Sequence, residues 1–452
     1  MTEPVSLEDL SRWTGESPER LVEWRALGLI GTEGVAFTSE DLELAGLVQL
    51  LLRRGINLEA ITKASWDLGP EMAAYIHLLF PEGVPRAYAV AEAATLAGLD
   101  PDSVRRLTAT VWPGRSVEWL AEDDITLLRT FKFSLEAGLP EFAVIELMKV
   151  YADALTRVAE AETRLTGFFA PQIEETGPTP REAIEAYRSG IERLFPLAAP
   201  VVDYFHRKAL LQASRLDVAR NLAEQLGLAT RSDVPGQMEM AVAFVDLSSF
   251  TPMTAEMGDL KAAEILQQFS QLVRESAAHS DGSVVKQIGD AFMIVFPQAA
   301  SSVACLLEIE RRVANETQFP AVRGGIAFGS VLYREGDYVG SLVNLASRLA
   351  GEADRHQILI TPEVRKGAAG LPDVEFVPAG KHRLKGIADD IELFEARVAG
   401  ARAGDRVVDP VCGMELGAGE VAVALTLEGA SQSFCSEDCL RKFVVSPERY
   451  KP

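Results

Sequence analysis

The sequence predicts a multidomain chain with an all-α N-terminal half, an α/β middle domain and a small α+β, cysteine-containing C-terminal module. Helical patterns fill the first half and repeat at one constant offset, whereas apolar strands alternate with helices over about residues 238–398. Three of the four cysteines lie at or beyond position 412. The length of 452 residues allows about three domains.

Composition and charge limit the partners that we expect. The formal net charge of −22 repels nucleic-acid phosphates and anionic membranes unless a basic patch overrides it locally. We see neither a secretion signal nor an uninterrupted apolar run of about 18 residues, so we expect a cytoplasmic protein without a membrane partner. In a reducing compartment, clustered cysteines indicate metal or redox chemistry rather than a disulfide framework.

The N-terminal half contains an internal duplication. Four punctuating residues keep their type under a shift of 83 residues: Gly15 with Gly98, Pro18 with Pro101, Asp41 with Asp124 and Gly55 with Gly138. Each copy is expected to combine a short helix, a glycine turn, a second helix and, after a loop, a long helix. Chance overlap of helix–turn patterns is the alternative interpretation.

Two aspartates mark a candidate cation site in the middle domain. Asp246 ends the apolar strand "MAVAFVD", and Asp290 lies at the turn of the hairpin "SVVKQIGDAFMIVF". If these strands are neighbours, the two carboxylates meet at one sheet edge and suit a hard divalent cation such as Mg²⁺. The segment "LSSFT" then turns into a helix whose N–H groups can receive a polyphosphate. Two ordinary turn aspartates are the alternative.

Further polar residues lie on the same hairpin and on a later helix. Lys286 interrupts an otherwise apolar strand, so it either reaches solvent or meets a polar partner. Asn344 and Arg348 are four residues apart on a helix that we expect to begin near Ser341, so they share one face. An amide beside a guanidinium suits a sugar oxygen and a phosphate. A solvated helix face is the alternative.

Ordered motifs in this domain resemble the catalytic domain of class III nucleotidyl cyclases, in its bacterial branch. The motifs are "FVDLSSFT", "VKQIGDAFMIVF", "GDYVGSLVNLASRL" and "HRLKGIADDIELFEA". The resemblance covers about residues 238–398 and implies a ferredoxin-like α/β fold.

The resemblance also implies roles for seven residues. Asp246 and Asp290 match the ligands of two metal ions, Mg²⁺ or Mn²⁺, and Lys286 and Asp337 match the pair that reads the purine. Asn344 matches the residue that orients the ribose, Arg348 the one that stabilises the transition state at the α-phosphate, and Lys385 the one that contacts the terminal phosphates.

The purine-reading pair predicts ATP as the substrate. Lys286 can only donate hydrogen bonds, and an ionised Asp337 can only accept them, which suits the N1 acceptor and N6 donor of adenine. The implied reaction is attack of the ribose 3′-oxygen on the α-phosphorus, which gives 3′,5′-cyclic AMP and pyrophosphate. Asp246, a water or the substrate itself stays open as the acceptor of the 3′ proton. A guanylate cyclase is the second enzymatic interpretation, which this pair disfavours.

In this family, active sites form between two catalytic domains in head-to-tail contact. One subunit supplies the metal-binding aspartates, and the other supplies the purine pair, the asparagine and the arginine. Because one domain here carries both sets, the resemblance implies a homodimer with two equivalent sites and an inactive monomer.

Residues 5–62 resemble the winged helix-turn-helix of MerR-type regulators, within a unit that we place at residues 1–70. DNA is a disfavoured partner, because residues 1–70 hold six basic against twelve acidic residues and the presumed wing "GTEGVAF" has no basic one. A helical interaction or dimerisation module is the preferred interpretation. Residues 84–228 resemble the helical regulatory domain of some bacterial cyclases, which implies control of activity through subunit orientation.

The tail, at residues 405–452, resembles a YHS domain through "DPVCGM", "FCSEDC" and the "F...P..Y" spacing that follows. It departs from that family in "LEGASQSF", where an aromatic-rich segment is usual. Cys412, Cys435 and Cys439 form a candidate site for Zn²⁺ or Cu⁺, held by thiolates. Three reduced thiols in a small core are the alternative, and Cys305 is most simply a core residue.

Together these features predict an adenylate cyclase that is regulated by its N-terminal helices. The competing hypothesis is a metal-responsive, DNA-binding regulator whose cyclase domain only binds nucleotide. The acidic N-terminal unit and the complete set of catalytic residue types argue against it.

Overall fold

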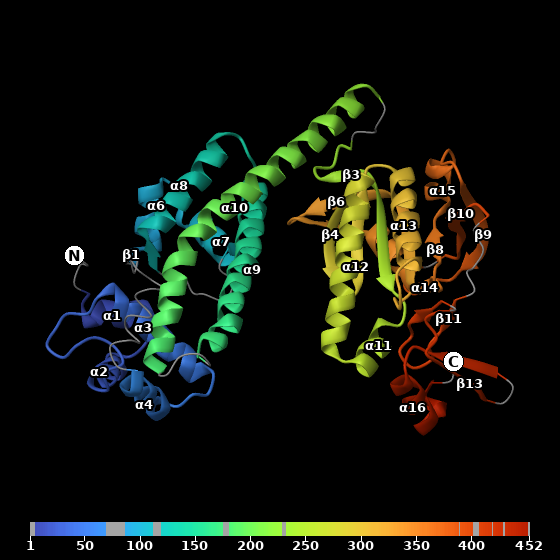
Figure 1. Cartoon of the computed structure of the whole chain (residues 1–452). Helices are drawn as coiled ribbons and strands as arrows, with labels where there is room; N and C mark the ends of the chain where they lie inside the picture. The colour runs from blue at the N-terminus through green and yellow to red at the C-terminus, as the bar shows by residue number, and fades with distance from the viewer. Residues whose placement is uncertain are drawn as a thin grey trace. The chain divides into compact units, whose positions relative to one another are not determined.

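The structure is a computed structural model that describes residues 5–68, 86–111, 119–174, 180–227, 232–387, 389–400, 406–417, 419–427 and 430–450. The chain divides into two compact units, Met1–Asn221 and Leu222–Pro452 (Figure 1). The expected limits between domains, near positions 70, 84, 228 and 405, lie outside the described residues. Among the described helices, none has the length and apolarity needed to cross a membrane.

Two similar sets of four helices make up most of the first unit. The first set is α1 (Leu7–Thr14), α2 (Pro18–Ala26), α3 (Ser39–Arg53) and α4 (Leu58–Leu68). The second set is α6 (Val90–Ala97), α7 (Pro101–Val111), α8 (Glu122–Glu136) and α9 (Glu141–Glu174). Each helix of the second set begins 83 residues after its counterpart, so the duplicated pattern in the sequence corresponds to a duplicated structure.

The matching residues perform the same local tasks in both sets. Gly15 and Gly98 end the first helix of each set with left-handed backbone, at φ 68° and 69°, which glycine adopts without strain. Asp41 and Asp124 each accept the backbone N–H three residues earlier, at 2.7 Å, and so cap the third helix of each set.

The expectation of an all-α N-terminal half is wrong in one detail. Strands β1 (Arg86–Ala89) and β2 (Trp119–Ala121) pair antiparallel, with Tyr88 opposite Leu120. An isolated bridge between Val5 and Phe37 occupies the equivalent place in the first set. In both sets, the chain before the first and third helices is extended, and pairing satisfies backbone groups beside buried side chains such as Phe37 and Leu120.

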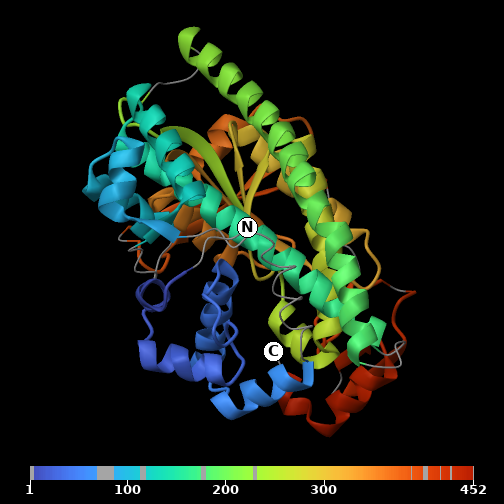
Figure 2. The ribbon, with the colours of Figure 1, turned by 90° about the vertical axis from the view of Figure 1, so that its left-hand side faces the viewer.

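The second helical set is followed by α10 (Pro180–Gln225), which Figure 2 shows as one long, continuous helix.

The second unit is built on a sheet with strand order β4-β5-β3-β6-β8-β10-β9, and β7 pairs with β6. All neighbours are antiparallel except β6 and β8. The strands are β3 (Gln237–Leu247), β4 (Ser283–Ile288), β5 (Ala291–Phe296), β6 (Val322–Arg334), β7 (Asp337–Val339), β8 (Ile358–Ile360), β9 (Val374–His382) and β10 (Ile391–Val398).

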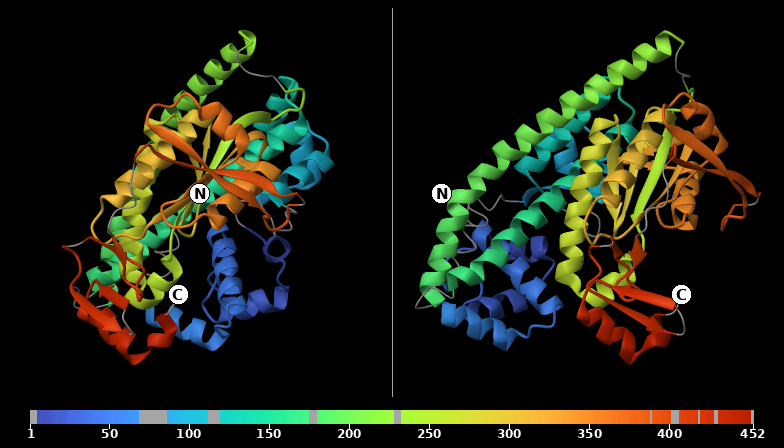
Figure 3. Two further views of the ribbon diagram at one scale, coloured as in Figure 1. Left: turned by 90° about the vertical axis from the view of Figure 1, so that its right-hand side faces the viewer. Right: turned by 45° about the vertical axis from the view of Figure 1, so that its right-hand side comes forward.

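The central strands β4-β5-β3-β6 have the β-α-β-β-α-β connection of ferredoxin-like folds. Alternate side chains of these strands face opposite sides of the sheet. Ala243 and Val245 join one core with α12 (Asp259–His279), α13 (Ala299–Ala314) and α15 (Pro362–Ala368), whereas Val242 and Phe244 pack with α14 (Ser341–Glu352) on the other face. Figure 3 shows these layers from two sides.

The C-terminal module consists of two small β-hairpins and a helix. Its elements are β11 (Val407–Val408), β12 (Glu415–Leu416), β13 (Val423–Leu427), β14 (Ala430–Phe434), α16 (Glu437–Val445) and a 3₁₀ turn at Pro447–Tyr450. Buried side chains of the module, including Phe434 and Phe443, belong to the same core cluster as the sheet face under α12 and α13. The Glu415 N–H donates to the Phe319 carbonyl at 3.3 Å, so the module also contacts the backbone of the segment that leads into β6.

Candidate active site

Asp246 and Asp290 meet at one edge of the sheet. Asp246 lies near the end of β3, and Asp290 lies at the turn between β4 and β5. Since β3 and β5 pair antiparallel and the last register pair is Val245 with Phe292, the two aspartates lie at adjoining strand ends. Burial and then the negative charge of Asp246 raise the pKa of Asp290 to about 7. The expected convergence therefore exists within one chain.

The aspartate pair has the chemistry of a cation site. Asp246 Oδ1 is buried and has no hydrogen-bond partner among the described residues. A buried carboxylate oxygen without a donor is unfavourable unless a proton or a cation compensates for it. Two adjoining carboxylates with such an oxygen fit Mg²⁺ or Mn²⁺, which prefer oxygen ligands.

Arg323 is a site residue that the sequence interpretation missed. It lies directly opposite Asp246 in the β3–β6 register. Its Nη2 and Nε donate to Asp246 Oδ2 at 2.8 and 3.2 Å, which fixes one carboxylate oxygen and leaves Oδ1 without a donor among the described residues. Local sequence patterns do not show this contact, because the two residues meet only through strand register. The sequence offers one sign that Arg323 has a polar partner, which is its place as a charged residue near the start of an apolar strand.

A turn and a short helix follow Asp246. The Ser248 N–H donates to the Ala321 carbonyl at 2.7 Å, and Ser249 is the N-cap of α11 (Phe250–Met257) with left-handed backbone at φ 67°. Non-glycine residues in this conformation persist where their surroundings hold them. The expected "LSSFT" turn thus leads into a helix, and we call residues 247–249 the phosphate turn.

Lys286 and Asp337 form an ion pair between β4 and β7. Asp337 Oδ1 also accepts the Tyr338 N–H at 2.8 Å, which orients the carboxylate. Each side chain of the pair is 37% exposed, so the pair is accessible to a ligand. The structure therefore brings together the two residues expected to read the purine, although they are 51 positions apart in the sequence.

Asn344 and Arg348 lie on α14, which begins at Ser341 as expected, and both are exposed. The buried face of α14 rests on β6 so closely that a Cβ on Gly325 would lie 2.2 Å from the Ala350 nitrogen. Glycine at this position fixes the depth of α14 and hence the height of Asn344 and Arg348 above the sheet. Lys385 is exposed after β9. These three residues face solvent in one chain.

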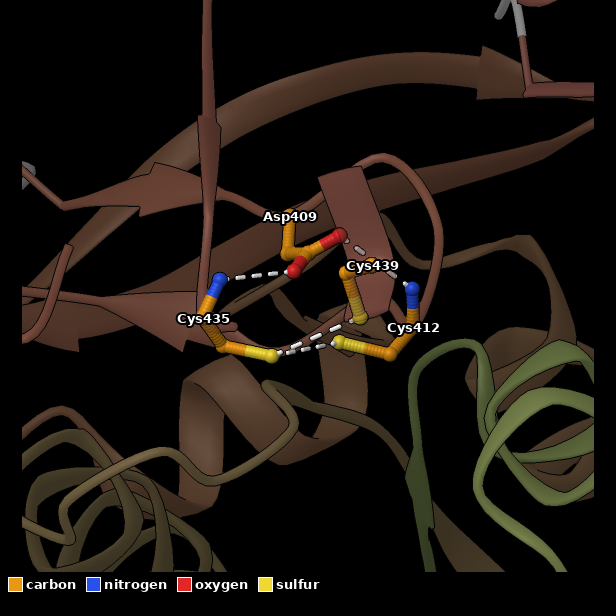
Figure 4. A group of neighbouring side chains, drawn as sticks. All are labelled: Asp409, Cys412, Cys435 and Cys439. Carbon is orange, nitrogen blue, oxygen red and sulfur yellow. Dashed lines mark hydrogen bonds between the residues drawn. The ribbon is translucent and has the colours of Figure 1, made fainter. Parts of the chain in front are cut away.

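The three C-terminal cysteines also meet. Cys412 and Cys435 sulfurs are 3.6 Å apart, as are those of Cys435 and Cys439 (Figure 4). Hydrogen bonding among the three sulfurs lowers the pKa of Cys439 and raises the pKa of Cys412. The fully buried Asp409 completes a set of four possible ligands, which the sequence interpretation did not include. Cys305 is buried in α13, in the core.

Comparison with known proteins identifies the two domains of the second unit. Residues 234–395 match the model of the adenylate and guanylate cyclase catalytic domain, and residues 407–452 match that of the YHS domain. The family match and the adenylate cyclases among the relatives confirm the expectation of an enzyme of the nucleotidyl cyclase class. The resemblance of the N-terminal unit to MerR-type regulators stays a prediction.

Several mycobacterial and streptomycete proteins resemble the chain over most of its length. An uncharacterized protein of Mycobacterium tuberculosis is 30% identical over 357 residues, which are 78% of this chain and 90% of the relative. A pH-sensitive adenylate cyclase of the same species is 27% identical over 373 residues, 80% of this chain and 90% of the relative. An adenylate cyclase of Streptomyces coelicolor is 28% identical over 288 residues, 62% and 71% respectively. The chain belongs to the adenylate and guanylate cyclase family and carries a C-terminal YHS domain.

Proposed function

We propose that the protein is an adenylate cyclase that converts ATP to 3′,5′-cyclic AMP and pyrophosphate. The ion pair between Lys286 and Asp337 is the observation that favours ATP, since it offers one donor and one acceptor to the purine. Adenine presents the complementary N1 acceptor and N6 donor, whereas guanine presents an O6 acceptor beside an N1 donor. The adenylate cyclases among the relatives support the same substrate.

Two divalent cations, Mg²⁺ or Mn²⁺, would be held by Asp246 and Asp290. When bound, such ions lower the pKa of the 3′-hydroxyl and clamp the phosphates. Arg323 holds Asp246 in place, and the first N–H groups of α11, which follows the phosphate turn, would face the developing negative charge. Arg348 offsets charge on the reacting phosphorus, Asn344 orients the ribose and Lys385 contacts the terminal phosphates.

We infer that two copies of the chain share each site. Class III cyclases function as dimers. Asn344 and Arg348 are exposed on α14, the helix that packs on this face of the sheet among the described elements. Exposed apolar residues Ile288, Tyr333 and Val339 lie on β4, β6 and β7 of the same domain. A head-to-tail homodimer would bury such residues and bring the aspartates of one chain to the Lys286–Asp337 pair of its partner copy.

Helix α10 offers a second surface for homodimer formation. Its residues Leu197, Val201, Tyr204, Leu211 and Val218 are each at least 50% exposed. They are separated by four, three, seven and seven residues, so they fall along one seam of a heptad pattern in which Lys208 and Arg215 occupy the intervening positions. Pairing of two copies of α10 would set subunit orientation, which is how we propose that the N-terminal helices regulate activity.

The N-terminal unit is better suited to protein contacts than to DNA. In α2, the presumed recognition helix, Arg20 pairs with Glu16 at 3.0 Å and Arg25 lies over the Phe37 ring at 3.4 Å from its centroid. Both cations are therefore engaged within the unit rather than clustered for phosphate contacts. A MerR-like interaction module fits these contacts better than a DNA reader.

The direct test is cyclic nucleotide production by the purified full chain with ATP or GTP and with Mg²⁺ or Mn²⁺. We expect cyclic AMP in excess over cyclic GMP, and a loss of at least about a hundredfold in Asp290→Asn, because a metal ligand is removed. Asp259→Asn, which changes an exposed carboxylate of the same domain, is the matched control and should retain the rate. Cyclic GMP as the main product, or no cyclic nucleotide, would contradict the proposal.

A further inference from the structure

The cysteine cluster has the spacing of a metal site. The Sγ–Sγ separations of 3.6 Å are far longer than the roughly 2.05 Å of a disulfide. Four ligands around a tetrahedral Zn²⁺ with Zn–S bonds of about 2.3 Å place sulfurs roughly 3.8 Å apart. The ligand atoms of Asp409 and the three cysteines all lie within 4.8 Å of one another (Figure 4).

The charge of the cluster favours a divalent ion. Asp409 is fully buried and accepts N–H groups of Val411, Cys412 and Cys435 at 2.8, 3.4 and 2.8 Å, so its carboxylate holds the segments that carry two of the thiols. Metal binding deprotonates the thiols, and a buried carboxylate beside three thiolates then needs positive charge to offset the loss of water. A Zn²⁺ ion supplies twice the charge of Cu⁺ and accepts both sulfur and carboxylate oxygen as ligands.

One of the ligand segments contacts the phosphate turn directly. Arg355, on the loop between α14 and β8, donates from Nη1 to the Gly413 carbonyl at 3.2 Å and from Nη2 to Ser249 Oγ at 2.7 Å. Gly413 follows Cys412, and a Cβ on Gly413 would lie 2.9 Å from the Ser249 Cβ. The Cys412 loop is thus in contact with the N-cap of α11, three residues after Asp246.

A second ligand segment holds the other end of α11. Lys442, on the helix that carries Cys439, donates to the Glu256 carbonyl at 2.7 Å. The Glu256 carboxylate, 9% exposed, is also 2.8 Å from Arg449 and accepts the Tyr450 hydroxyl at 3.0 Å. An ion that joins Cys412 to Cys439 would therefore fix the two segments that contact the two ends of α11.

We propose that the YHS domain binds one Zn²⁺ through Cys412, Cys435 and Cys439, beside Asp409, and that this ion holds the phosphate turn in its active conformation through Arg355. Ser249 has left-handed backbone, which its contacts must maintain. Loss of the ion releases the Cys412 loop and with it the Arg355–Ser249 bond. The regulatory half of this inference rests on the proposed cyclase function.

Zinc binding is tested on the reduced full chain, independently of activity. We expect one tightly held Zn²⁺ per chain, and thiolate-to-metal charge-transfer absorption when Co²⁺ replaces it. Cys412→Ser and Cys439→Ser should lose both signals, whereas Cys305→Ala, which removes the thiol in α13, should keep them. Unchanged Zn²⁺ content in both cluster variants, or uptake of Cu⁺ with no uptake of Zn²⁺, would overturn the site.

Regulation is tested by removing Zn²⁺ with a thiophilic-metal chelator while Mg²⁺ stays in excess. We expect the KM for ATP to rise at least about fivefold, the lower end of typical coupling between sites. Arg355→Gln should keep its Zn²⁺ but have the raised KM for ATP even before the chelator is added. Removing Zn²⁺ from this variant should then change its KM no further. Arg406→Gln is the matched control and should still respond. It loses bonds to the Ala314, Glu316 and Glu415 carbonyls and to the Glu420 carboxylate, but it touches no residue of the phosphate turn.

The outcomes separate the two proposals. Cyclic AMP formation with the same KM in the zinc-bound and zinc-free chain would overturn the regulatory inference and leave the cyclase intact. Zinc binding without cyclic AMP under any condition would contradict the cyclase function instead. The two results can be separated because Zn²⁺ content and the Co²⁺ absorption measure the metal site without any need for activity.

Discussion

Replacing His356 with glutamine should weaken the second unit in a pH-dependent manner. His356 lies where the catalytic domain meets the YHS domain, with Nε2 2.5 Å from Glu415 Oε2 and Nδ1 3.1 Å from Glu310 Oε1. The Glu310 and Glu415 carboxylates raise the pKa of His356 to about 9, against the opposing effect of burial. The charged imidazolium therefore joins α13 to β12.

The magnitude follows from proton linkage. A rise of the His356 pKa from 6.5 to about 9 corresponds to at most about 3 kcal/mol of folding free energy, because one pKa unit is worth about 1.36 kcal/mol. Since the folded-state pKa is raised, this stabilisation is fully present below the unfolded value of 6.5 and is lost as the pH rises through about 9. At about pH 9.5 the wild type and the variant should differ little from this cause.

Urea unfolding of the full chain measures this contribution. All five tryptophans lie in the first unit, at positions 13, 24, 66, 112 and 119, so tryptophan fluorescence follows that unit. A circular-dichroism transition without a tryptophan change belongs to the second unit. We expect His356→Gln to lower its free energy of unfolding by about 2–3 kcal/mol at about pH 6 and by much less at about pH 9.5.

His382→Gln removes another imidazole from the same unit and is the matched control, because its ring contacts Glu352 within the catalytic domain. An equal loss of stability at both pH values in His356→Gln would show that the ring acts through packing alone. That result would refute the linkage argument.

Three further predictions concern the catalytic domain and α10. Burial and then the charge of Asp246 raise the pKa of Asp290 to about 7, so a cation competes with a proton at this carboxylate. The Mg²⁺ concentration that gives half-maximal activity should therefore decrease as the pH is raised from about 6 to about 8. The same Mg²⁺ requirement at every pH would contradict this. Gly325→Ala should displace α14, because the added Cβ would collide with its backbone. We expect cyclase rates to fall at least about tenfold and the free energy of unfolding in urea to fall by about 1–3 kcal/mol. Wild-type values for both would show that α14 does not pack tightly on β6. Val218→Glu should weaken dimers in sedimentation and lower activity in parallel, and an unchanged dimer would exclude the α10 seam.

Much of the catalytic site could be predicted because its signals are local. The hairpin turn at Asp290 and the helix that begins at Ser341 follow from patterns within a few residues. Polar residues that interrupt apolar strands, such as Lys286, also point to a partner. The resemblance then supplied the partner, Asp337, which no local pattern identifies.

The contacts that local patterns did not predict are those made through tertiary structure. Arg323 meets Asp246 through strand register, and Arg355 meets Ser249 from a loop more than a hundred positions away. His356 meets Glu415, its second carboxylate partner beside Glu310, only because the YHS domain docks next to α13. The short strands β1 and β2 were missed because three or four extended residues before a helix carry too little alternation to predict pairing.

The most direct test of shared cyclase sites is complementation between two inactive full-length variants. In the proposed site, Asp290→Ala removes a metal ligand and Arg348→Ala removes the cation that faces the reacting phosphate, so we expect neither homodimer to form cyclic AMP. An equimolar mixture should recover about a quarter of wild-type activity, because half of the dimers are mixed and each mixed dimer has one intact site of two. A mixture that stays inactive although both variants fold and exchange subunits, or a single variant that keeps its activity, would contradict the account.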